Sequence, residues 1–397
     1  MAEAIEATRA AALARIAAVR PADYARTRNA IDGAVSGLSP WLTHGIVSLP
    51  EVLAGVLARQ PLAVQHKFVF ELGWRAFFRH VWAQRGDGIF ESLHAGPLPD
   101  AAYTRAVPAD VRQAATGVPV VDQAVRTLYA TGTLHNHARM WLASYLVHLR
   151  KVHWRAGADW LHAHLLDGDL ASNHLSWQWV AGTGSHKPYL FNAENVARFA
   201  PPAWHSPGTV VDATYEALDL FARDASAVAP AGSGAPVDEP ALLHAPPADL
   251  GLQPPDAAAV ADRDVWLVHP WALGELPADL PAGAQVLGVL LADFHASWPW
   301  SARRWHFVGT RMADLAPLRW WGDAAAIGAA LAGARRVRSV GDPHIDRWLA
   351  SWAEVTPPPV LFPTVDRRCD SFSQWWTRAT RGLHDAAELL PAAPADA

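Results

Sequence analysis

The sequence holds a single cysteine, Cys369, among its 397 residues. One thiol cannot form an internal disulfide or a zinc site of four thiolates, which excludes disulfide-braced and zinc-ribbon folds. No apolar run approaches about 18 residues, so we expect no membrane span. The first residues lack a basic stretch followed by an apolar one, so we also expect no secretory signal. These absences predict a cytoplasmic protein without a metal site.

Charged residues are also few, at 18% of the chain, and only three of the 33 basic residues are lysines. Arginine therefore carries almost all of the positive charge, and its planar guanidinium suits carboxylate and phosphate recognition. The formal net charge of −5 neither requires nor excludes nucleic acid, because binding depends on a local basic face. Aromatic residues are plentiful instead, with 20 tryptophans, and 51% hydrophobic residues provide ample material for a globular core.

Two patterns of apolar residues divide the chain. In residues 1–222 they recur three and four positions apart, which predicts helices. Residues 223–262 are rich in proline, alanine and glycine and are typical of a linker. Residues 263–390 alternate short apolar runs with helical stretches, which indicates a parallel sheet flanked by helices, and 391–397 are expected to form a disordered tail. The candidate strands are 265–268, 286–291, 318–321, 336–340 and 360–362, and the candidate helices of this part are 301–315 and 323–332.

The segment Ser36-Gly37-Leu38-Ser39 stands directly before a helical run. Hydroxyls and free main-chain N–H groups at a helix start can hold phosphate. A plain helix cap with proline in the first turn explains the same residues, and taken alone it is the better explanation.

A second candidate lies on a helix that contains Glu71, Trp74, Arg75 and Phe78. These positions share one helix face, and their apolar neighbours favour a pocket over a fully solvated surface. The segment 135–140, His-Asn-His-Ala-Arg-Met, invites a metal or nuclease interpretation. We reject both, because residues two apart on a helix point apart and no thiolate or carboxylate cluster follows.

The densest segment is 167–179, with two acids around a glycine, then an amide and two tryptophans. A helix cap explains Asp169 but gives no reason for Asn173, Trp177 and Trp179. A calcium loop fits less well, because its ligands do not recur at odd positions and no glutamate closes the loop.

Taken together, blocks between about Tyr24 and Asn195 resemble the FAD-binding domain of the photolyase and cryptochrome family. Together with the alternating pattern of residues 263–390, the resemblance predicts a multi-domain α plus α/β protein, in which an all-helical photolyase-type FAD-binding domain is followed by a Rossmann-like α/β domain. The blocks stand in family order: Ser-Gly-Leu-Ser-Pro-Trp-Leu from 36, Glu-Leu-Gly-Trp-Arg-Ala-Phe-Phe from 71, Thr-Gly-Val-Pro-Val-Val-Asp from 116, His-Asn-His-Ala-Arg-Met from 135, Asp-Trp-Leu from 159 and Asp-Gly-Asp-Leu-Ala-Ser-Asn from 167.

The resemblance implies FAD as the cofactor and assigns its contacts. The diphosphate would lie near Tyr24, Ser36, Leu38 and Ser39. Arg139 and Asp167 would form an ion pair against the flavin ring. Asp169 would face the polar edge of the flavin, and Asn173 would lie beside its N5 atom. The implied FAD-binding set is Tyr24, Ser36, Leu38, Ser39, Arg75, Arg139, Asp167, Asp169 and Asn173.

The resemblance also implies a function: a blue-light-driven DNA photolyase that splits pyrimidine dimers by electron transfer from reduced FAD. A cryptochrome-like photosensor without repair activity is the alternative, and a light-independent flavoprotein is a third possibility. Glu71 and Asn136 would act on the dimer, and Trp177 and Trp154 would conduct electrons from the protein to the flavin. The substrate pocket would be walled by Trp74, Met140 and Trp179.

Three departures from the family pattern stand out. No tryptophan occupies residues 101–103, where a third electron carrier is expected, so Tyr103 or Trp141 could replace it. His137 stands where many repair enzymes have arginine. The α/β-like residues 264–345 follow the helical part instead of preceding it, which we interpret as circular permutation. With this order no antenna chromophore is predicted, and UV-damaged DNA is the expected partner.

Overall fold

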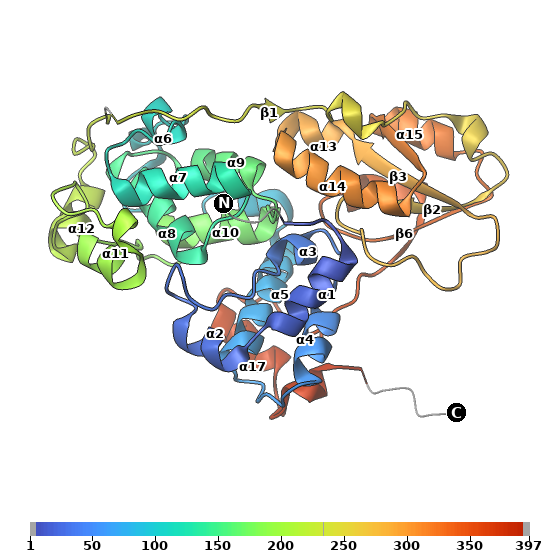
Figure 1. Cartoon of the computed structure of the whole chain (residues 1–397), viewed down its shortest axis with the longest axis horizontal. Helices are drawn as coiled ribbons and strands as arrows, with labels where there is room; N and C mark the ends of the chain where they lie inside the picture. The colour runs from blue at the N-terminus through green and yellow to red at the C-terminus, as the bar shows by residue number, and fades with distance from the viewer. Residues whose placement is uncertain (1–4, 233, 392–397) are drawn as a thin grey trace.

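Helices fill the first part of the chain in the computed structural model, which describes residues 5–232 and 234–391 (Figure 1). Sequence signals explain where several begin and end: α7 starts at Pro119 and ends before Gly132, whose φ is 70°. The helices are α1 (Arg9–Ala18), α2 (Pro21–Thr27), α3 (Ser39–Thr43), α4 (Leu49–Leu57), α5 (Lys67–Arg85), α6 (Ala109–Arg112), α7 (Pro119–Thr131), α8 (Asn136–Ser144), the π-helix η3 (Tyr145–Leu149), α9 (Trp154–His164), α10 (Leu170–Ala181), α11 (Ala193–Phe199) and α12 (Tyr215–Arg223).

A parallel five-stranded sheet follows, in the order β5-β3-β2-β6-β7. Its central strands are buried, as expected of a sheet flanked by helices. The α plus α/β class is therefore confirmed. The elements are β2 (Asp264–Val268), β3 (Gln285–Leu291), α13 (Ala292–Ser297), α14 (Ala302–Leu315), β5 (Leu318–Gly322), α15 (Ala324–Leu331), β6 (Arg336–Val340), α16 (Asp346–Trp352) and β7 (Glu354–Thr356).

The fifth predicted strand, 360–362, is wrong. The fifth strand of the sheet is β7, a short edge strand whose three residues are exposed. An exposed edge strand carries no apolar run, so periodicity could not find it. Leu361 and Phe362 are not part of any strand. Their apolar side chains are buried in a cluster that includes Trp376, which explains the apolar run in the sequence.

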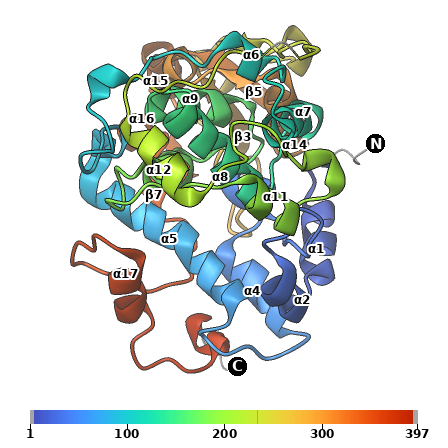
Figure 2. The ribbon, with the colours of Figure 1, turned by 90° about the vertical axis from the view of Figure 1, so that its left-hand side faces the viewer.

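The C-terminal segment turns back to the helical part. Helix α17 (Phe372–Ala379) packs against α5, far from the sheet (Figure 2). Trp376 Nε1 donates to Gln65 Oε1 at 3.0 Å, and Phe70 lies against Phe372 with ring centroids 4.6 Å apart. This helix therefore packs on the helical part, although it follows the sheet in the chain. The predicted tail, 391–397, lies outside the described residues from 392 onward.

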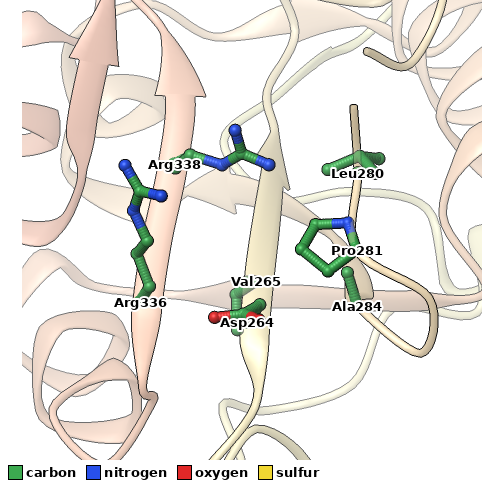
Figure 3. Close-up of a pocket in the computed structure, with 7 residues that line it drawn as sticks. All are labelled: Asp264, Val265, Leu280, Pro281, Ala284, Arg336 and Arg338. Carbon is green, nitrogen blue, oxygen red and sulfur yellow. The ribbon is translucent and has the colours of Figure 1, made fainter. Parts of the chain in front are cut away.

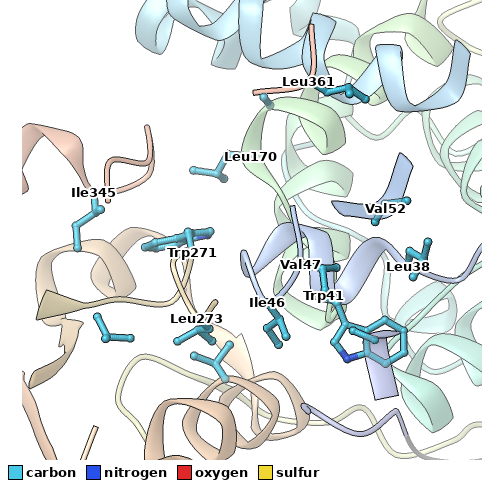
Figure 4. Close-up of a cluster of buried hydrophobic side chains, with 14 of the residues drawn as sticks. Leu38, Trp41, Ile46, Val47, Val52, Leu170, Trp271, Leu273, Ile345 and Leu361 are labelled. Carbon is cyan, nitrogen blue, oxygen red and sulfur yellow. The ribbon is translucent and has the colours of Figure 1, made fainter. Parts of the chain in front are cut away.

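The apolar core consists of two clusters. One lies within the helices from α6 to α12. The other joins the N-terminal helices, the sheet and α17, and Figure 4 shows Trp41 and Ile46 in the same region as Trp271 and Ile345. Burial of this shared apolar surface fixes the α/β part on the first helices.

Residues 224–263 connect the two parts with little regular structure. Within them β1 (Leu242–Leu243) pairs with β4 (Trp300–Ser301) in an antiparallel bridge. Across the described residues, no helix combines the length and apolar character needed to span a bilayer.

Candidate functional site

Glu71, a predicted catalytic residue, lies on α5 where α2 packs against it. Its Oε1 is 3.5 Å from Nε of Arg28, and its side chain is 36% exposed. Burial raises the pKa of Glu71, and the charge of Arg28 opposes this rise without cancelling it. A half-buried carboxyl group accepts hydrogen bonds when ionised and can donate one only when protonated.

Trp74, one turn after Glu71, packs against the C-terminal helix. Its ring stacks on Phe372 with centroids 4.0 Å apart and an interplanar angle of 13°. Gly73 permits this packing, since a Cβ there would lie 2.5 Å from the ring of Trp376. One face of the predicted substrate-binding Trp74 is therefore covered by α17.

Helix α8 brings the predicted residues Asn136 and Met140 together, with Asn136 Nδ2 3.4 Å from Met140 Sδ. His137 turns onto the ring of Trp141, with centroids 5.5 Å apart and an interplanar angle of 3°. Its Nδ1 also hydrogen-bonds to the main-chain oxygen of Asn29. Trp141 is completely buried, so it cannot be the surface end of an electron path.

Arg139 and Asp167 form the expected ion pair, with Arg139 Nη2 2.8 Å from both carboxylate oxygens. Arg75 reaches the same loop through Thr43: Nη1 and Nη2 of Arg75 lie 3.1 Å from Thr43 Oγ1. Thr43 Oγ1 in turn donates to the main-chain oxygen of Asp167 at 3.3 Å. The structure thus gathers three predicted FAD ligands at the loop between α9 and α10.

Asp169 caps α10 and anchors a buried charge network. Its Oδ1 accepts from the main-chain N–H of Ser172 at 2.8 Å, and its Oδ2 accepts from Arg79 at 2.6 Å. Arg79 also contacts Asp342, at 3.1 Å, and Asp342 Oδ1 lies 2.6 Å from Nδ1 of His344. Burial raises the pKa of Asp169, but the charges of Arg79 and His344 outweigh it and hold this pKa well below its usual range. Asp169 is therefore a charged, buried carboxylate.

Three further predicted residues lie where α9 and α10 pack together. Asn173 Nδ2 donates to the main-chain oxygen of Ala158 at 2.9 Å, which leaves Oδ1 as the acceptor. Trp177 is buried against Gly157, where a Cβ would lie 2.3 Å from its ring. Trp154 is also buried, and its Nε1 donates to Ser92 Oγ at 2.9 Å.

Two lines of aromatic residues lead outward from Trp154. One passes through His153 to Tyr103, with centroid distances of 5.7 and 6.2 Å. The other passes through His174 to Trp298, with distances of 6.4 and 5.3 Å. Both end residues are partly exposed. Trp298 belongs to the α/β part, so no local sequence signal links it with Trp154.

The predicted phosphate segment forms a turn in which Gly37 has a φ of 63°. Leu38 is buried, and the turn is held by Arg15, whose Nε donates to the main-chain oxygen of Ser36 at 2.5 Å. Ser39 begins the short helix α3. Tyr24 packs edge-on against a phenylalanine of α5, and burial, followed by the charge of Glu71, raises its pKa.

Trp179 is 42% exposed at the end of α10, with its ring 5.5 Å from that of Tyr189. Among the described aromatic contacts, none joins Trp179 to Trp74. The structure therefore places the two predicted pocket walls on different helices without bringing their rings into contact.

Two cavities lie away from these residues. A pocket of about 50 Å³ is lined by the amino ends of β2 and β6 (Figure 3), and its Arg336 and Arg338 pair with Glu354 and Asp279. A groove of about 600 Å³ lies between residues 5–8 and α14. Neither cavity contains a residue of the predicted FAD or substrate sets. Within the part of the chain that the structure describes, no group of three or more potential ligands is arranged to hold a metal ion.

Sequence reasoning missed several polar partners of the site. Arg79 follows Arg75 by one turn, so the helix face that carries Arg75 could have revealed it. Arg15, Arg28 and Thr43 act through contacts between segments far apart in the chain, for which the sequence holds no local signal.

The sequence profile of the FAD binding domain of DNA photolyase matches residues 68–203, which run from α5 past α11 and include Glu71, Arg139 and Asn173. This segment of the helical part is therefore similar to the FAD-binding domain of DNA photolyase. The match leaves out Tyr24 and the turn at Ser36, and the roles of the site residues inside and outside it stay predictions.

Individual proteins are similar to less than half of this chain. A deoxyribodipyrimidine photo-lyase of Streptomyces griseus is 39% identical over 168 residues, which are 41% of this chain and 36% of that protein. A chloroplastic/mitochondrial cryptochrome DASH of Ostreococcus tauri is 34% identical over 191 residues, covering 46% of this chain and 35% of the relative. The chain in a crystal structure of a Synechocystis cryptochrome is 31% identical in sequence. The match covers 48% of this chain and 43% of that chain, with a TM-score of 0.43. The chain thus spans less than half the length of these relatives.

The residues of the helical part fit FAD chemically. The left-handed turn at Gly37 stands between Ser36 and Ser39, and hydroxyls and main-chain N–H groups at such a turn suit a diphosphate. The Arg75 guanidinium donates only to a neutral hydroxyl among the described residues, so its charge is available to a bound anion. Asn173 Oδ1 provides an acceptor in the buried interior.

Proposed function

We propose that this protein is an FAD-dependent, blue-light-driven lyase of the photolyase type that splits pyrimidine dimers in DNA. One observation carries the proposal: α5 presents Glu71, with its raised pKa, and one turn later Arg75, which leads through Thr43 to Asp167. A single rigid helix thereby joins a group suited to the lesion with groups suited to the flavin.

On the substrate side, the side chains would receive a dimer flipped out of the DNA stack, because a buried cofactor cannot reach a stacked base. Trp74 and Trp179 would form aromatic walls, and Asn136 with Met140 would line the pocket from α8. Glu71 would hydrogen-bond to a dimer carbonyl and stabilise the negative charge that the dimer gains.

On the cofactor side, bound FAD would supply an electron donor that absorbs blue light. Arg139 would favour the electron-rich reduced ring through its positive charge, with Asp167 holding the guanidinium in place. Asn173 would accept a hydrogen bond from the ring at Oδ1. Asp169 would face the polar edge of the flavin. Trp177 and Trp154 would supply electrons from the protein to the flavin during photoreduction.

The domain order is part of the proposal. The strand order β5-β3-β2-β6-β7 supports a Rossmann-like unit, since numbering these strands along the chain gives the order 3-2-1-4-5. We take residues 1–222 as the FAD-binding domain, 223–262 as a linker and 263–390 as the α/β unit, circularly permuted relative to the family order. The return of α17 to α5 would then keep the C-terminal end of this unit in contact with the FAD-binding domain.

A photosensor without repair activity is the second candidate. Phe372 favours it, because it covers one face of Trp74 and leaves less of that ring for a substrate. The two functions share FAD and differ in whether DNA is changed.

The test is an absorption spectrum of the purified protein, followed by blue-light illumination with a thiol reductant and an oligonucleotide that contains a thymine dimer. We expect bound flavin and light-dependent loss of the dimer. Flavin that is photoreduced while the dimer persists would establish the photosensor instead. A protein that binds no flavin would contradict both.

A further inference from the structure

Arg304 of α14 reaches from the α/β part into the loop between α9 and α10. It is completely buried, with 0% of its surface exposed. Its Nη1 donates to the main-chain oxygen of His162 at 2.8 Å, and its Nη2 donates to that of Gly168 at 2.5 Å. The guanidinium also lies over the ring of Trp300, 4.2 Å from the centroid.

No carboxylate among the described residues forms an ion pair with Arg304, and its Nε has no hydrogen-bond partner there. Burying an unpaired charge is costly, so packing alone would favour an apolar residue at this position. Burial lowers the pKa of Arg304 to about 9, and Asp167 and Asp169 oppose this change. The guanidinium is therefore still charged at neutral pH.

Contact between Arg304 and the loop is too close to allow a side chain at Gly168. A Cβ at this position would lie 2.4 Å from Arg304 Nη1 and 2.6 Å from the main-chain oxygen of His162. Gly168 separates Asp167 from Asp169, so the guanidinium fixes the main chain between the two acids that are assigned to the flavin.

We infer that Arg304 is a positioning residue of the flavin site, which holds the loop of Asp167 and Asp169 and adds a buried positive charge that favours reduced flavin. The inference rests on the FAD-binding part of the proposed function and does not require DNA repair. It makes the α/β part a contributor to the redox properties of the helical part. Arg75 and Arg139 supply charge from the helices, whereas Arg304 supplies it across the boundary between the two parts.

The test compares Arg304→Gln and Arg304→Met, which remove the charge, with Arg304→Lys, which keeps it. Arg303→Gln is the matched control, because Arg303 is the exposed neighbour on the same helix. The midpoint potential of bound flavin is measured against a reference dye, and melting temperatures are measured with and without FAD. We expect the reduced-to-oxidised ratio at a fixed potential to fall roughly tenfold in the neutral variants, because a positive charge in a buried site stabilises the electron-rich reduced flavin.

We expect Arg304→Lys to keep a potential near that of the unmodified protein but to melt earlier, because it loses the paired donation to His162 and Gly168. Arg303→Gln should change neither quantity. An unchanged potential in a folded neutral variant would overturn the inference and leave Arg304 as a link between the two parts. If neither neutral variant folds, a potential in Arg304→Lys as low as that of flavin free in solution would also overturn it. Dimer repair is measured separately, so loss of the proposed repair function would not be mistaken for failure of this inference.

Discussion

Under the proposed function, Glu71 acts on the dimer and not on the flavin. It faces Arg28, which caps the C-terminal end of α2, and it lies outside the charge network of Asp169, so replacing it should leave FAD in place. We expect Glu71→Ala to slow dimer splitting by about tenfold to a hundredfold, the range for a lost hydrogen bond to a charged group. The quantum yield of dimer loss under blue light measures this, with the exposed Glu91→Gln as the control. Full activity in Glu71→Ala would remove Glu71 from the mechanism.

Individual residues were predictable where they belong to a recognised sequence block. Arg139 and Asp167 were expected as a pair and form one. Arg79 and Thr43 were not expected. Arg79 contacts Asp169 and Thr43 contacts the main chain of Asp167, so their importance comes from neighbours in space and not in the sequence. A sequence block identifies residue types at fixed spacing, and it does not reveal which distant side chain neutralises or orients them.

At the scale of elements, α5 and α17 meet through a glycine. In an isolated helix Gly73→Ala would stabilise by about 1 kcal/mol. Here the new Cβ would lie 2.5 Å from the ring of Trp376, so we expect a net loss of about 1–3 kcal/mol in the free energy of unfolding. Urea denaturation measures this change, and the double variant with Trp376→Leu supplies the control. If Gly73→Ala destabilises equally in both backgrounds, the contact with Trp376 is not the cause.

The helices and strands show what apolar periodicity can predict. A 19-residue helix and four buried or half-buried strands carry repeating apolar signals and were found. The sequence did not reveal β7 or the partner of α17, for opposite reasons. β7 is exposed and carries no signal, whereas α17 buries aromatic residues against a helix about 300 positions earlier, and nothing local identifies that partner.

The stability of the whole molecule should depend on pH through buried histidines. His148 is completely buried and hydrogen-bonds through Nε2 to the main-chain oxygen of Val180 at 2.9 Å. Burial lowers its pKa from 6.5 to about 4, so between these values the unfolded chain binds a proton that the folded chain does not. The free energy of unfolding should therefore fall as the pH falls from 6.5 to 4, by roughly 3 kcal/mol for this residue.

Denaturation curves at pH 7 and pH 5 measure this effect. His148→Gln should lose less stability between the two values than the unmodified protein does. His384→Gln, at an exposed histidine, should behave like the unmodified protein. An identical pH dependence in all three proteins would show that His148 does not contribute.

The arrangement of the two parts was the least predictable property of the molecule. Alternating strands and helices indicated an α/β unit, but the apolar core that joins it to the first helices draws on residues from both ends of the chain. Arg304 and Asp342, which both contribute polar contacts across this boundary, were invisible in the sequence for the same reason. Chain order therefore limits which groups are recognised as parts of one site.

A prediction about photoreduction concerns the whole molecule. One of the two aromatic paths that lead outward from Trp154 crosses from the helical part to the α/β part. Oxidised tryptophan can hold a positive charge briefly, whereas a phenol must release its proton, and burial raises the pKa of Tyr103. We therefore expect the path through His174 to Trp298 to carry more electrons than the path through His153 to Tyr103. With a thiol as the external reductant, Trp154→Phe should slow photoreduction most, followed by Trp298→Phe and then Tyr103→Phe.

The rate of flavin bleaching under blue light measures this order, and transient absorption identifies the radical that persists. Trp348→Phe, a partly exposed tryptophan on α16, is the control for general effects of removing an indole. A larger effect of Tyr103→Phe than of Trp298→Phe would place the exit within the helical part. Equal rates in Trp298→Phe and the control would show that the α/β part takes no share in electron delivery, although it contacts the loop between α9 and α10 through Arg304.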